Sequence, residues 1–128
     1  MSTFTKNCAI NGKDFDMLKI TFNKQAQTAT LHGTWGVSST GYSYKLTPMP
    51  QSKTNEVHLE FEEIKPTGRQ FCVMPFLEVN ADFAITDDTS DVYIHVVQNT
   101  DDIFSLSDDG KTKKEMLVMH CSATPDPA

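Results

Sequence analysis

The stretch TATLHGTWGVS, residues 28–38, decides the fold class. Its odd-numbered positions are apolar or small and its even-numbered positions are mostly polar, which is typical of a strand with one buried side and one solvent-facing side. The same period of two recurs in further runs, among them residues 18–22, 42–46, 57–61 and 92–96. No window of the chain has a helical period long enough to compete. The sequence therefore predicts an all-β protein.

Turn residues separate these runs. Asn11-Gly12 stands between two predicted strands and is the strongest short-range signal for a hairpin. Residues 65–68, KPTG, have the composition of a tight turn. About eight to ten strand candidates are joined in this way. We therefore expect a single-domain antiparallel β-sandwich, immunoglobulin-like or jelly-roll-like, with a closed β-barrel as the second choice.

The predicted domain spans residues 1–121. The segment that follows, SATPDPA at residues 122–128, is rich in proline, which cannot donate to a strand ladder, and we expect it to be a disordered tail. Within the domain, Trp35 lies on the same side of its predicted strand as Leu31 and Val37, because all three are at odd-numbered positions. This position predicts that Trp35 packs in the core and does not belong to a recognition loop.

The charge balance argues against one class of partner. The 128 residues include 17 acidic and 11 basic side chains, for a net charge of −6. The single arginine is Arg69, and the densest basic group, residues 111–114, directly follows Asp108-Asp109. We therefore expect no nucleic-acid binding, which needs a clustered basic face. No apolar run approaches the ~20 residues of a membrane-spanning helix. An acidic surface instead favours a basic protein partner.

Three cysteines, Cys8, Cys72 and Cys121, form an odd set without metal-ligand spacing. The first residues lack the apolar segment of a signal peptide. Both observations favour free thiols and a cytoplasmic location. Cys72 lies in a nearly continuous apolar run, residues 71–79, which predicts a strand buried on both sides and an inert thiol.

Four histidines occupy positions opposite the apolar face of their predicted strands. They are His32, His58, His95 and His120. Several imidazoles on one sheet face would be able to bind zinc or copper. These four lie on different strands with no H-x-H spacing, and nothing in the sequence makes those strands neighbours. We therefore expect four solvent-facing or rim histidines, and the sequence leaves open whether they converge.

Acidic turns give an alternative site. The carboxylates that would fall at one end of the fold, if the intervening strands alternate in direction, are Asp87, Asp88, Asp91, Asp108 and Asp109. Oxygen ligands on adjacent loops suit calcium, so this cluster is the candidate calcium site. Apart from this candidate, we expect no cofactor. Aspartate is also common in turns because its side chain bonds its own backbone.

Catalytic motifs are absent: the chain has no G-x-S-x-G, P-loop, G-x-G-x-x-G or H-E-x-x-H. We therefore expect a non-catalytic binding module, of the kind found in immunity or inhibitor proteins, that engages a basic protein partner. Its partner-facing residues are predicted to be Glu56, Glu60 and Glu62, which share the outward side of one strand. Two alternatives stay open: a calcium-dependent β-sandwich that binds a carbohydrate or lipid head group, and a homo-oligomeric, self-assembling structural protein.

Overall fold

A computed structural model describes residues 3–37, 41–50, 53–64, 76–100 and 112–125. These residues contain eight strands and no helix, which confirms the all-β prediction. The strands are β1 (Thr3–Ile10), β2 (Lys13–Asn23), β3 (Thr28–Gly36), β4 (Ser43–Pro48), β5 (Glu56–Ile64), β6 (Phe76–Ala84), β7 (Asp91–Thr100) and β8 (Thr112–Ser122).

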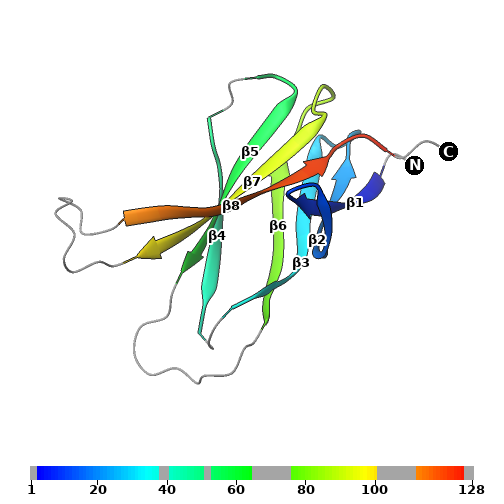
Figure 1. Cartoon of the computed structure of the whole chain (residues 1–128). Helices are drawn as coiled ribbons and strands as arrows, with labels where there is room; N and C mark the ends of the chain where they lie inside the picture. Colours follow the sequence, from blue (N-terminus) through cyan, green and yellow to red (C-terminus); the bar gives the residue numbers. More distant parts are fainter. Residues whose placement is uncertain (1–2, 38–40, 51–52, 65–75, 101–111, 126–128) are drawn as a thin grey trace.

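All eight strands belong to one sheet, in the order β4-β5-β7-β8-β1-β2-β3-β6. The sheet curls until its two edge strands, β4 and β6, approach each other, which gives a nearly closed barrel with one unsealed seam (Figure 1). The first and last strands, β1 and β8, lie side by side in it. Every neighbouring pair is antiparallel except β5 and β7, which are parallel.

The predicted two-sheet sandwich is therefore wrong, and the second choice, a barrel, is closer to the structure. The strand pattern has the same period in both architectures, because an apolar face is buried equally well against a second sheet or inside a curled one. The parallel pair follows from the path of the chain: it leaves β5, enters β6 at the opposite edge of the sheet, and returns to β7 beside β5.

The interior of the barrel is lined by the apolar side of each strand. Its largest fully buried apolar side chains are Phe22, Phe61, Leu18, Ile20, Leu31, Leu59, Ile94 and Met119. Trp35 packs against this core between Phe15 and Phe61, with ring centroids 5.8 Å from each. Its indole N–H donates to the carboxylate of Glu63, so the ring lies at the core boundary with its polar end satisfied.

Two local backbone features shape the sheet, the Asn11-Gly12 turn and the close approach of β2 and β3 at Gly33. Asn11 and Gly12 both have positive φ, 52° and 80°, which is the backbone of a two-residue hairpin turn, and they join Ile10 to Lys13 as predicted. Gly33 has φ of 134° on β3, opposite Leu18 of β2. A Cβ at Gly33 would lie 2.0 Å from the Met17 carbonyl oxygen, so the backbones of β2 and β3 approach too closely there for any other residue.

The run 71–79 differs from its prediction in the part that the structure describes. Phe76 is 63% exposed and Glu78 is exposed, while Val79 is buried, so β6 is not buried on both sides. Cys72 lies outside the described residues. After β8, Ala123 is buried and its N–H donates to the Ser90 carbonyl at 2.8 Å. The domain bounds 1–121 and the tail 122–128 stay predictions.

Candidate functional site

The outward side of β5, β7 and β8 carries a continuous polar surface, which we call the histidine face. It consists of Glu56, His58, Glu60, Glu62, Asp91, Tyr93, His95, Glu115, Val118 and His120. The register places His58 beside Tyr93, and Tyr93 beside His120. It likewise places Glu60 beside His95 and His95 beside Val118. Side chains two residues apart on one strand share a face, so these rows align into one surface.

One hydrogen-bonded chain crosses the histidine face from β5 to β8. Glu56 Oε1 lies 3.2 Å from His58 Nε2, His58 Nδ1 lies 2.9 Å from His95 Nε2, and His95 Nδ1 lies 3.2 Å from Glu115 Oε1. Both histidine side chains are only 20–24% exposed. Lys53 Nζ adds a longer ion pair to Glu56 at 3.8 Å. This series of contacts therefore links the carboxylates of Glu56 and Glu115 through the two imidazoles.

The number of protons in this chain follows from its hydrogen bonds. Each bond needs one proton, and ionised carboxylates only accept, so the three bonds require three protons on the four ring nitrogens of His58 and His95. Two neutral imidazoles supply only two protons. The three contacts are therefore not all hydrogen bonds at once when both rings are neutral, and the ring tautomers decide which of them form.

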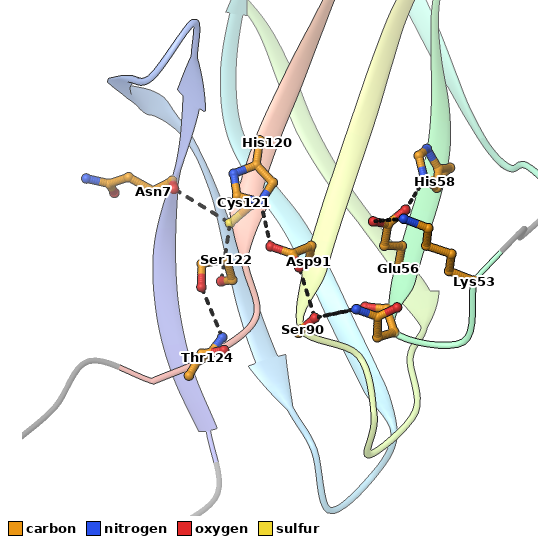
Figure 2. Close-up of polar contacts among 11 residues, drawn as sticks. Asn7, Lys53, Glu56, His58, Ser90, Asp91, His120, Cys121, Ser122 and Thr124 are labelled. Atoms are coloured by element: carbon orange, nitrogen blue, oxygen red, sulfur yellow. Dashed lines mark hydrogen bonds and ion pairs between the residues drawn. The ribbon is translucent and has the colours of Figure 1, made fainter.

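A second ion pair lies at the adjacent corner, where β7 begins. Asp91 Oδ1 is 2.7 Å from His120 Nε2, and the Ser90 hydroxyl donates to Asp91 Oδ2 at 2.9 Å (Figure 2). The Asn55 amide in turn donates to the Ser90 hydroxyl at 3.2 Å. The hydrogen bond from His120 is the main cause that lowers the pKa of Asp91. Burial opposes this effect, and the bond from Ser90 and the charge of His120 lower the pKa further.

Aromatic rings connect the Glu56–His58–His95–Glu115 contacts with the Asp91–His120 pair. Tyr93 lies between His58 and His120, with ring centroids 4.9 Å from each and interplanar angles of 16° and 37°. His95 stacks on the His58 ring at 5.2 Å. Burial is the main cause that raises the pKa of Tyr93, and the negative charges of Asp91 and Glu56 add to it. The centre of the face is thus aromatic, and its carboxylates stand around the rings.

The predicted partner-facing carboxylates, Glu56, Glu60 and Glu62, do lie on the outward side of β5. Glu60 is placed between Thr47 of β4 and His95 of β7, and Glu62 is placed opposite Lys45. Their position on one surface agrees with the alternation of the strand. Their role toward a partner stays a prediction.

The structure brings together histidines whose convergence the sequence left open. His58 and His95 are in contact, and His120 lies on the same face on the far side of Tyr93, because β7 lies between β5 and β8. His32 is elsewhere, on β3, where its Nε2 lies 2.8 Å from the Thr21 hydroxyl of β2. The meeting depends on the parallel pairing of β5 with β7, for which the sequence carries no local signal.

The candidate calcium site is only partly within the described residues. Asp87 and Asp88 are exposed in the turn before β7, and Asp91 is engaged by His120. Asp108 and Asp109 lie outside the described residues. Strand β8 begins at Thr112, which pairs with Thr100 at the opposite end of β7 from Asp91. Across the described ranges, no group of three or more potential ligands is arranged to hold a metal ion. The calcium site stays a prediction.

A hollow of about 350 Å³ borders the histidine face where β1 and β8 separate. Its lining consists of Thr5, Lys6, Asn7, Ala9, Asp14, His120 and Ser122. His120 therefore belongs both to the face and to this hollow. The lining is mostly polar, which is unlike a site for an apolar ligand.

Comparisons with known proteins identify no relative: no family model matches the chain, and no curated protein or solved structure is similar to it. Within the described part of the chain, no helix is long and apolar enough to cross a membrane.

Proposed function

We propose that this protein is a non-catalytic binding module whose histidine face binds a basic segment of another protein. The observation that carries the proposal is the stack of His58, Tyr93 and His120 with carboxylates at both ends. Protein interfaces favour an aromatic centre inside a polar rim, and tyrosine is enriched at the positions that contribute most to affinity.

The chemistry of the face suits lysine and arginine side chains. Glu60, Glu62 and Glu115 stand close enough along the strands to receive the neighbouring charges of an extended basic segment. The net charge of −6 increases the rate of encounter with a cationic partner more than the final affinity.

The test uses an arginine- and glycine-rich decapeptide as the probe, with a glutamate-rich decapeptide as its counterpart. Amide chemical-shift mapping is expected to place the basic peptide on the histidine face. The triple variant E56Q/E60Q/E62Q should lose about tenfold in affinity, because each lost charge contact is worth a few tenths to 1 kcal/mol.

The matched control is D16N/E78Q/D87N, which removes the same charge from exposed carboxylates of β2, β6 and the turn before β7. It should bind the basic peptide almost as well as the natural chain. Equal losses in both variants, or shifts that map to another part of the barrel, would show that only net charge attracts the peptide and would refute the proposal.

A further inference from the structure

The first and last strands of the barrel place two thiols opposite each other. Strand β1 pairs with β8 through Ala9 and His120, and then through Ile10 and Met119. Cys8 precedes Ala9 and Cys121 follows His120, so the antiparallel direction of the two strands brings the two cysteines side by side just beyond the last ladder pair. Both cysteines are free and buried, with 0% and 1% of their surface exposed.

Contacts of Cys121 agree with this placement. Cys121 Sγ lies 3.6 Å from the carbonyl oxygen of Asn7 (Figure 2). It lies 3.7 Å from that of Lys6, so the sulfur is against the β1 backbone that leads into Cys8. The two thiols also interact directly: a hydrogen bond to Cys121 is the main cause that raises the pKa of Cys8, followed by burial and the charge that a Cys121 thiolate would carry.

We propose that Cys8 and Cys121 are a modification site that a low-molecular-weight disulfide, such as glutathione disulfide, converts into an intramolecular disulfide. Opposite residues of an antiparallel pair have Cα atoms about 4.5–5.5 Å apart, which lies within the 4.4–6.8 Å that a disulfide spans. The bond therefore forms without moving either strand far.

The reaction proceeds by two exchanges that balance atoms and electrons. One protein thiol loses its proton to solvent, and its thiolate attacks the reagent, which forms a mixed disulfide and releases one reagent thiolate. The second protein thiol, deprotonated in turn, attacks the mixed disulfide. The bond between Cys8 and Cys121 forms as the mixed disulfide breaks. Two protein thiols are oxidised, and one reagent disulfide is reduced to two thiols.

The reagent reaches these thiols where the sheet is least continuous. The ladder between β1 and β8 consists of two residue pairs, and β1 carries a register shift between Asn7 and Cys8. The hollow described above lies along this gap, and Asn7, Ser122 and His120 belong to its lining. Local separation of two strands held by so few bonds costs less than global unfolding. The reaction is expected to be slow, because the raised pKa of Cys8 limits the thiolate.

The test incubates the reduced full chain with glutathione disulfide under native conditions, followed by peptide mapping without reduction. A cross-linked peptide pair containing Cys8 and Cys121 is expected, with the loss of two hydrogens and no retained glutathione. The melting temperature should rise by about 10 °C, because the bond joins the two ends of the fold, and dithiothreitol should reverse the rise.

The matched variants are C72A, which should still form the bond, and C121A, which should retain glutathione or stay reduced. If C121A does not fold, mapping of the natural chain and of C72A decides the question. A cross-link through Cys72, glutathione retained on Cys8 or Cys121, or two thiols still free after prolonged incubation would each overturn the proposal. None of these outcomes depends on whether the histidine face binds a basic peptide.

Discussion

The hydroxyl of Tyr44 bridges the seam of the barrel by bonding both backbone groups of Asn80. It donates to the Asn80 carbonyl oxygen at 3.1 Å and accepts from the Asn80 N–H at 2.9 Å. Tyr44 belongs to β4 and Asn80 to β6, the two edge strands that do not pair with each other. The ring of Tyr44 stacks on Phe61 at 5.3 Å, so one side chain anchors in the core and spans the gap between the edges. An unpaired edge strand exposes backbone groups, and this tyrosine satisfies two of them.

The variant Tyr44→Phe is expected to loosen the seam. It keeps the stacking on Phe61 and loses both bonds to Asn80, so the free energy of unfolding should fall by about 1–2 kcal/mol. Urea unfolding measures this loss. Hydrogen exchange at the Asn80 amide should accelerate, which reports the seam itself. Tyr93→Phe removes a hydroxyl from the outer face and is the matched control; an equal loss there would contradict the role of Tyr44.

Replacement of Gly33 is expected to be among the most damaging single changes in the chain. Gly33→Ala places a methyl group against the Met17 carbonyl and forces alanine into φ of 134°, so the two strands must separate or the register must shift. We expect a loss of more than about 3 kcal/mol, or failure to fold. Gly36→Ala is the control, because its Cβ would meet only the Phe76 ring at 3.9 Å. Similar thermal melts for the two variants would disprove the close approach.

The pair of Asp91 and His120 makes stability depend on pH in acid. The folded state lowers the pKa of Asp91, so the unfolded chain binds this proton more readily. The contribution is therefore fully present above the unfolded pKa, near about 4, and is lost as the pH falls through the lower folded value. Thermal melts between about pH 2 and 6 should show a shallower acid loss in Asp91→Asn than in the natural chain. Asp87→Asn, in the preceding turn, should leave the slope unchanged.

Local features of the structure could be predicted because they depend on neighbours in sequence. Alternation placed Leu31 inward and His32 outward, and the Asn11-Gly12 turn lies where its backbone preferences require. Glu56, Glu60 and Glu62 share the outward side of β5 for the same reason. A period of two assigns each residue to a side of its strand whatever the strand pairs with.

The assembly of these strands could not be predicted in the same way. Whether the apolar sides meet across two sheets or inside one curled sheet depends on contacts between residues far apart in the chain. Such contacts place β7 beside β5 in parallel, and this brings His58 against His95. They also place β1 beside β8, and this pairs Ala9 with His120 and brings the Cys121 sulfur against the backbone at Asn7. The amino-acid order by itself determined most of the strands and the side of the strand on which most of their residues lie, since both are local. Only the tertiary structure decided which outward residues became neighbours, because that choice minimises the free energy of the whole barrel and not of any one strand.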